Sequence, residues 1–236
     1  MAAQPQPISS RPYQIRPWRL FTALAAPPID RLAQVPIPSG RAYGNITLLE
    51  SFILVATMRL VHAQRLFEFG TFLGRTTFIL ALNSAPSAHI FTLDFDAATD
   101  PSILQHEADA GLTAMHRNAN ALDFMGTPVE DKVTLLNGDS LRFDFSLYHG
   151  QMDWIFIDAG HDRVSVQSDT ENALRMINRD RPSCIAWHDY QNPEYPDLTG
   201  YLDELSRQEP LFHVADSKVC LWINDPARAL VPALLA

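Results

Sequence analysis

The sequence is short of cysteine, of positive charge and of long apolar runs, and each shortage excludes a class of protein. Its 236 residues include two cysteines, Cys184 and Cys220, which lie far apart in apolar stretches. This excludes a CxxC-type metal site and favours two buried free thiols in a reducing cytoplasm over a disulfide. No apolar run approaches the roughly 20 residues of a membrane helix, and the N-terminal residues lack the apolar core of a signal peptide.

Positive charge is also scarce. Lys and Arg together number 18 against 27 Asp and Glu, the formal net charge is −9, and only Lys132 and Lys218 are lysines. A general nucleic-acid binder needs a basic surface, so we expect no nucleic-acid partner and no membrane partner. The hydrophobic content of 47% is ordinary for a globular protein and sufficient for a sizeable core.

Proline is concentrated at one end of the chain. Residues 1–43 are predicted to form a proline-rich arm ahead of one domain at residues 44–236. The prolines argue against a long helix or a central strand in the arm. Because Tyr13, Trp18, Leu20 and Phe21 are apolar, we expect the arm to dock on its own domain or on a partner subunit, rather than to remain extended in solvent.

From residue 44 onward, strand and helix patterns alternate. Thr47 and Glu50 form a capping-box pattern at the start of an apolar helical repeat. Further helices are predicted over residues 75–84, 100–124, 163–177 and 197–208, and strands over 65–69, 89–95, 132–140, 152–160 and 183–190. This alternation predicts an α/β fold, with helices on both faces of a mostly parallel sheet. The last two strands, within residues 211–225, are joined too tightly for a crossover and must pair antiparallel.

The turn after the first predicted strand of this domain points to a ligand. In "FEFGTFLGRTT", Gly70 and Gly74 stand four residues apart, and parallel sheets bind ligands at such strand ends. A dinucleotide needs G-x-G-x-x-G, because its pyrophosphate nearly touches the main chain. Here Phe72 and Leu73 fill the turn, and the carboxylate of Glu68 would repel phosphate and favour a cation. The turn therefore favours a ligand without phosphate.

Polar residues also end the next two strands. Asp94, with Asp96 as the alternative, is placed to accept the hydroxyl groups of a ribose. Asp139 and Ser140 end the following strand, where they could meet an adenine edge. A nucleoside that carries a positive centre and no phosphate describes S-adenosylmethionine.

Five stretches together resemble a class I S-adenosylmethionine-dependent methyltransferase: "FEFGTFLGRTT", "TLDFD", "LLNGDS", "DWIFIDAGHDRVSVQSDTENAL" and "IAWHDY". The FIDxxH…HDY pattern is similar to a bacterial branch that contains small-molecule O-methyltransferases and cephalosporin-hydroxylase-like proteins. Over residues 44–225 the resemblance implies a Rossmann-like, seven-stranded sheet with a C-terminal antiparallel hairpin. It implies cofactor contacts at Glu68, Gly70, Thr71, Phe72, Gly74, Thr76, Asp94, Asp139, Ser140 and Asp158.

Three departures from the family pattern stand out. Phe72 replaces the middle glycine of the usual turn, "RDRPS" replaces a glycine pair before the fifth strand, and residues 97–126 form a long insertion.

The segments "FIDAGHD" and "WHDY" end two strands that we expect to be neighbours, which makes Asp158, His161, His188 and Asp189 the candidate catalytic residues. In one alternative, Asp158 and Asp189 bind Mg²⁺, and His161 is the base, as the resemblance to catechol-type and macrolide-sugar O-methyltransferases implies. In the other, no metal binds, and His161 or His188 takes the proton directly.

The resulting prediction is O-methylation of a small hydroxylated molecule, such as a sugar, a phenol or a natural-product intermediate. A non-catalytic nucleoside-binding domain that recruits a partner is an alternative, and an NAD-dependent dehydrogenase is a less favoured one. A homodimer formed through the arm or through the helix near residues 46–61 is a further hypothesis.

Overall fold

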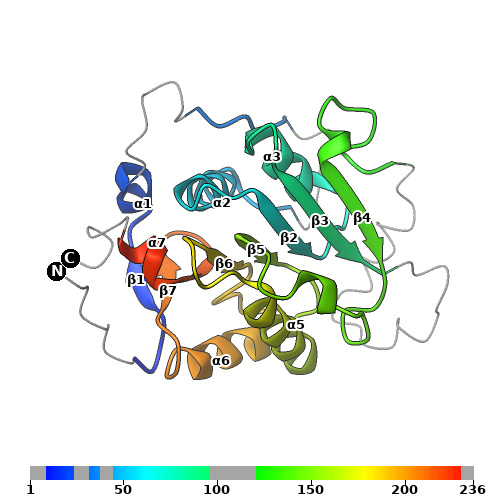
Figure 1. Ribbon diagram of the computed structural model, residues 1–236. Helices are drawn as coiled ribbons and strands as arrows, with labels where there is room; N and C mark the ends of the chain where they lie inside the picture. The colour runs from blue at the N-terminus through cyan, green and yellow to red at the C-terminus, as the bar shows by residue number, and fades with distance from the viewer. Residues whose placement is uncertain (1–8, 24–31, 38–44, 96–120, 230–236) are drawn as a thin grey trace.

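The computed structural model describes residues 9–23, 32–37, 45–95 and 121–229 (Figure 1). Most of the predicted helix over residues 100–124, and most of the insertion at 97–126, lie outside these ranges. Residues 121–126 form turns rather than the end of a helix. None of the helices that the structure describes is long and apolar enough to cross a bilayer.

The described residues form a single sheet of eight strands, in the order β1-β7-β8-β6-β5-β2-β3-β4. The strands are β1 (Tyr13–Ile15), β2 (Arg65–Phe69), β3 (His89–Asp94), β4 (Val133–Asn137), β5 (Trp154–Ile157), β6 (Cys184–Trp187), β7 (Leu211–Val214) and β8 (Cys220–Ile223). All pairs are parallel except those of β8, which runs antiparallel to both β6 and β7. The predicted α/β class and the C-terminal antiparallel hairpin are confirmed.

Helices cover both faces of the sheet (Figure 1). Successive side chains of a strand point to opposite faces, and β5 shows the consequence. Trp154 and Phe156 share one core with α2 (Leu48–Leu60) and α3 (Arg75–Asn83), whereas Ile155 and Ile157 share another with α5 (Arg163–Met176) and α6 (Pro196–Leu205). Within the described residues there are also four short helices: α1 (Pro17–Ala23), α7 (Asp225–Ala229), and the 3₁₀ helices η3 (Glu130–Lys132) and η4 (Ser146–Tyr148).

The described part of the arm docks on its own domain. β1 pairs in parallel with β7, which makes eight strands where the resemblance implied seven. Gln34 and Asn83 exchange two hydrogen bonds of 2.8 Å each, so a second arm segment is tied to α3. A strand of three residues at the sheet edge is compatible with the flanking prolines, because an edge strand can lose donors without breaking the sheet. The division into an arm and a domain between residues 43 and 44 stays a prediction.

Local sequence signals account for two helix starts near the site. Thr47 and Glu50 form the predicted capping box of α2. Asp162 caps α5 by accepting the N–H groups of Val164 and Ser165, and so ends the loop that follows β5. The two cysteines are buried free thiols, as expected.

Candidate functional site

The five strands that carry the predicted site residues are adjacent in the sheet. β4, β3, β2, β5 and β6 are consecutive neighbours. Main-chain hydrogen bonds continue past their carboxyl ends: the N–H of Gly70 donates to Leu93, that of Asp158 to Phe69, and that of His188 to Ile157. The candidate cofactor turn and the candidate reaction centre therefore lie side by side, and the two strands expected to be neighbours, β5 and β6, pair directly.

A close approach of two loops explains why residue 70 is a glycine. Gly70 has a φ of 89°, and a Cβ at this position would lie 2.1 Å from the carbonyl oxygen of Asp158. Any side chain would force the turn after β2 away from the end of β5. Gly74, with a φ of 76°, is similarly confined, because a Cβ there would come within 2.9 Å of the Phe124 ring.

Phe72 adopts the conformation that a glycine would adopt in the middle of this turn. Its φ is 48°, which is unusual for a residue with a side chain. Its N–H donates to Oδ2 of Asp94 at 2.7 Å, and Oδ1 of Asp94 accepts the N–H of Phe95 at 2.8 Å. The turn thus keeps a glycine-like path despite the substitution, and Asp94 holds it there.

Glu68 is buried beneath the turn rather than exposed to a ligand. Oε2 accepts hydrogen bonds from the hydroxyl groups of Thr77 and Thr92, the latter at 2.6 Å, and Thr71 in turn hydrogen-bonds Thr92 at 2.7 Å. Burial raises the pKa of Glu68 to about 8, although the two threonine hydroxyls lower it. The carboxyl group is therefore mostly neutral near pH 7 and would not repel a phosphate group, contrary to the expectation from the sequence. If Glu68 contributes to cofactor binding, it does so through the place of its side chain beneath the turn and not through a negative charge.

The remaining predicted cofactor residues lie at the same edge of the sheet. Asp139 accepts the N–H of Leu141 at 3.0 Å in the turn after β4. Ser140 lies next to Asp169 of α5, whose pKa is raised to about 7 by burial. Thr76 lies half-buried in the first turn of α3. The cofactor roles of these residues stay predictions.

His161 stands between two predicted partners and an aromatic ring. Its Nε2 atom lies 3.2 Å from Oδ2 of Asp189 and 3.9 Å from Oδ1 of Asp158. The ring of Tyr195 stacks on it, with centroids 3.8 Å apart and planes at 11°. One donor atom from each of Asp158, His161 and Asp189 lies within 4.8 Å of the others. The structure thus assembles a carboxylate–imidazole group from the ends of β5 and β6.

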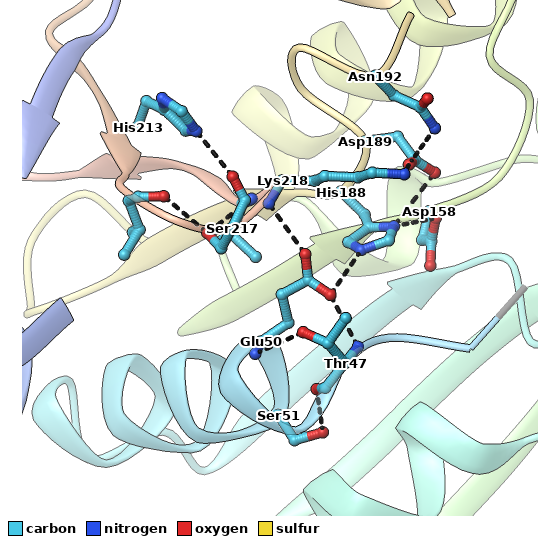
Figure 2. A network of polar contacts seen from close by, with 12 residues as sticks. Thr47, Glu50, Ser51, Asp158, His188, Asp189, Asn192, His213, Ser217 and Lys218 are labelled. Atoms are coloured by element: carbon cyan, nitrogen blue, oxygen red, sulfur yellow. Dashed lines mark hydrogen bonds and ion pairs between the residues drawn. The ribbon is translucent and has the colours of Figure 1, made fainter. Parts of the chain in front are cut away.

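His188 lies in the middle of a second set of contacts (Figure 2). Its Nδ1 atom is 3.4 Å from Asp158 Oδ1 and 3.2 Å from Asp189 Oδ2, and its Nε2 atom is 3.3 Å from Glu50 Oε2. Burial alone would lower the pKa of His188, but these three carboxylates outweigh it and raise the pKa well above its usual value. His188 therefore carries a proton at neutral pH.

Glu50 and Lys218 belong to this network, and the sequence did not identify either as a site residue. The carboxylate of Glu50 accepts the N–H of Lys218 at 2.9 Å, and the Lys218 ammonium lies 3.2 Å from Asp189 Oδ1, which also accepts the Asn192 side-chain amide at 2.7 Å (Figure 2). Burial would raise the pKa of Glu50, yet the charge of His188 and the backbone hydrogen bonds lower it to about 2. The capping-box pattern had already accounted for Glu50 as a helix residue, and the scarcity of lysine was the one signal that singled out Lys218.

Asp189 is ionised at neutral pH. Burial would raise its pKa, but His161, His188 and Asn192 lower it to well below the usual range of an aspartate. The backbone of Asp189 is itself unusual, with a φ of 58°. Strained backbone of this kind is frequent at functional sites.

Comparison with known proteins identifies the family to which the chain belongs. The family whose model matches residues 67–190, just over half of the chain, is described as a methyltransferase domain. No curated protein matches the chain.

The solved structures that have a similar fold include three methyltransferases. A methyltransferase from Geobacter sulfurreducens is 17% identical over 77% of this chain and 80% of its own, with a TM-score of 0.51. The O-methyltransferase TomG from Streptomyces achromogenes, involved in tomaymycin synthesis and solved with S-adenosylmethionine, is 15% identical over 76% and 82%, with a TM-score of 0.50. An O-methyltransferase from Bacillus cereus, in complex with S-adenosylhomocysteine, is 16% identical over 87% and 89%, also with a TM-score of 0.50.

Proposed function

Because the chain belongs to the methyltransferase domain family, we propose that it transfers the methyl group of S-adenosylmethionine to a hydroxyl oxygen of a small molecule. The observation that carries the proposal is the position of His161. Its ring stacks on Tyr195 and lies 3.2 Å from Asp189, and it follows β5, the neighbour of β2 in the sheet, so it lies close to the turn after β2. O-methyltransferases among the structures of similar fold support oxygen as the acceptor atom.

In the proposed reaction, the acceptor oxygen attacks the sulfonium methyl carbon while its proton passes to His161. The carbon–sulfur bond breaks, its electron pair stays on sulfur, and neutral S-adenosylhomocysteine leaves. Nε2 of His161 faces a carboxylate oxygen of Asp189, so Nε2 carries the hydrogen of the neutral ring and Nδ1 accepts the proton. Asp189 then stabilises the imidazolium, and alignment of the reacting atoms supplies much of the remaining acceleration.

His188 fits a bracing role better than that of a base. It already holds a proton, because Asp158, Asp189 and Glu50 surround it. A protonated imidazole cannot accept the hydroxyl proton. We therefore assign the base to His161, and we assign to His188 the neutralisation of the carboxylates around it.

Mg²⁺ at Asp158 and Asp189 fits these residues poorly. Magnesium prefers oxygen ligands in near-octahedral geometry. Oδ1 of Asp189 already contacts Lys218 and Asn192, and Oδ2 contacts His161 and His188. A metal ion between the two carboxylates would be repelled by the Lys218 ammonium and by the protonated His188. Of the two alternatives that the sequence leaves open, we therefore favour the one without a metal.

The cofactor part of the proposal is tested by calorimetry with S-adenosylhomocysteine and with NAD⁺. We expect saturable binding of S-adenosylhomocysteine and none of NAD⁺. The reverse result would support the dehydrogenase alternative and overturn the proposal.

The chemical part is tested by incubating a panel of sugars, phenols and hydroxylated natural-product intermediates with isotopically labelled S-adenosylmethionine. We expect labelled methyl ethers from at least one compound. His161→Asn should abolish turnover while it retains S-adenosylhomocysteine affinity, and the exposed His149→Asn is the matched control. Cofactor binding with no turnover on any compound would favour the non-catalytic alternative.

Action in the cytoplasm and assembly as a homodimer are also part of the proposal. The two buried free thiols suit a reducing compartment. Sedimentation of the purified protein would test the dimer.

A further inference from the structure

We infer that Lys218 is the built-in cation of the candidate active site: its ammonium group holds Asp189 in place and excludes a divalent metal ion from the Asp158–Asp189 pair. The inference deepens the proposed function and rests on it for the catalytic consequence. The geometry that supports it involves the hairpin between β7 and β8, which no sequence motif of the site includes.

The turn that carries Lys218 is clamped to the strands on either side. His213 Nε2 lies 2.8 Å from the carbonyl oxygen of Ser217, and the Ser217 hydroxyl donates to Val214 at 2.7 Å and accepts the N–H of Val219 at 3.1 Å. Asp216, at the tip, has the left-handed φ of 63°. This local network determines where the Lys218 main chain lies (Figure 2).

The Lys218 main chain is also tied to both sides of the site. Its N–H donates to Glu50 Oε1 at 2.9 Å, and its carbonyl oxygen accepts the N–H of Tyr190, the residue after Asp189, at 3.0 Å. The side chain then reaches back to Asp189 Oδ1 at 3.2 Å. Lys218 therefore contacts the α2 start, the chain after β6 and the Asp189 carboxylate at once.

The local charges explain why such a cation is needed. Asp158, Asp189 and Glu50 place three carboxylates around His188, which supplies one compensating positive charge. Lys218 supplies the second, leaving a single net negative charge, which His161 offsets when it takes up a proton. Metal-binding carboxylate pairs work differently, because there the divalent ion supplies the compensating charge.

The position of Lys218 has a consequence for Asp189. One oxygen of Asp189 is held by Lys218 and Asn192, so the other is directed at His161. The side-chain contact of Lys218 is with Asp189, so we assign its effect to that carboxylate. It is therefore a positioning residue, and its loss would free the carboxylate pair for a metal ion.

The exclusion of a divalent ion is tested by titrating the protein with Mn²⁺ alone. Binding is measured as the decrease in the EPR signal of the free ion. We expect Lys218→Ala and Lys218→Met to bind one Mn²⁺ at least about tenfold more tightly than the unmodified protein, because removing a nearby positive charge removes its repulsion. Lys218→Arg should restore the weak binding. The matched control is Lys132→Ala, since Lys132 is the other lysine of the chain and caps the end of α3 through Ala81 and Ser84.

Equal Mn²⁺ affinity in the unmodified protein and both variants would overturn the inference, as would tight binding by Lys218→Arg. The methionine variant keeps the apolar stem, so it separates lost charge from lost packing. Because Mn²⁺ binding requires neither cofactor nor acceptor, it tests Lys218 even if S-adenosylhomocysteine fails to bind and the proposed function fails. On any acceptor that the protein methylates, the unmodified protein should keep its kcat in EDTA. Lys218→Ala should have a lower kcat, with little increase in KM.

Discussion

Oε2 of Glu50 lies 3.3 Å from Nε2 of His188, and the same oxygen accepts the N–H of Thr47 at 2.7 Å. One side chain thus completes the capping box of α2 and pairs with the protonated imidazole at the end of β6. Glu50 is 2% exposed, so this ion pair is screened little by solvent. The helix start and the candidate reaction centre are thereby coupled.

Glu50→Gln should separate the charge from the cap. Glutamine can still cap the helix, but His188 loses a buried partner, and we expect a cost of about 3 kcal/mol in the free energy of unfolding at pH 7. Thr47→Ala, which removes the cap and keeps the charge, should cost only about 1 kcal/mol. Urea denaturation of both variants makes the comparison. Equal losses would show that the cap alone accounts for the stability at this position.

The same pair of variants has a predicted pH dependence. The pKa of Glu50 is lowered to about 2, so its stabilising contribution is present above the unfolded value of 4.5 and is lost as the pH falls through 2. The difference between Glu50→Gln and the unmodified protein should therefore shrink below pH 4.5. The cost of Thr47→Ala should change much less over that range.

The sequence predicted the strand ends well because they depend on local pattern. Asp158, His161, His188 and Asp189 follow apolar runs, and adjacent strands bring their ends together wherever the sheet is parallel. The contacts of Lys218 with Glu50 and Asp189 were not predictable in this way. They join segments 168 and 29 residues apart, and they depend on the path of the hairpin and on the start of α2.

The sequence also did not predict the eighth strand or the contact that requires glycine at residue 70, because neither produces a local pattern. β1 has three residues among prolines, which is too short for a periodic signal. The requirement for glycine at residue 70 comes from the carbonyl of Asp158, which is distant in the chain. Burial of Glu68 likewise depends on tertiary packing, so its charge state could not be deduced from its place after an apolar run.

Gly70→Ala should disrupt the turn far more than an ordinary glycine substitution. The added Cβ would meet the Asp158 carbonyl at 2.1 Å, and neither backbone segment can move without breaking the sheet hydrogen bonds beside it. We expect a loss of 3 kcal/mol or more, on the order of other severe core substitutions, together with weaker S-adenosylhomocysteine binding.

Gly126→Ala is the matched control for Gly70→Ala. Gly126 also has a positive φ, of 71°, but among the described residues no atom outside its chain neighbours lies within 4 Å of a Cβ built there. Its cost should be the conformational term alone, about 1 kcal/mol. If thermal or urea unfolding gave the two variants the same loss, the close contact with Asp158 would not be the reason for glycine at position 70.

Glu68→Gln should change how stability depends on pH. The folded protein keeps a proton on Glu68 up to a pKa of about 8, whereas the unfolded chain releases it near 4.5. Between these values the folded state binds more protons, so the contribution of Glu68 to stability falls as the pH rises. Glu68→Gln removes this decline. Its free energy of unfolding, relative to that of the unmodified protein, should therefore rise by on the order of 1 kcal/mol per pH unit across that window. Glu171→Gln, at an exposed position on α5, should show no such trend in urea unfolding from pH 5 to 8.

Asp94→Asn should weaken cofactor binding through the shape of the turn. The two carboxylate oxygens accept the N–H groups of Phe72 and Phe95, and an asparagine has one accepting oxygen, so one of these bonds is lost. Phe72, held at a φ of 48°, would then be free to relax out of its strained conformation. We expect S-adenosylhomocysteine affinity to fall by roughly 10- to 100-fold, the equivalent of one hydrogen bond to a charged group. Asp144→Asn is the control, since Asp144 caps the exposed turn at Ser146. Calorimetry that found Asp94→Asn and Asp144→Asn equally able to bind the cofactor would contradict a role for Asp94 in the cofactor turn.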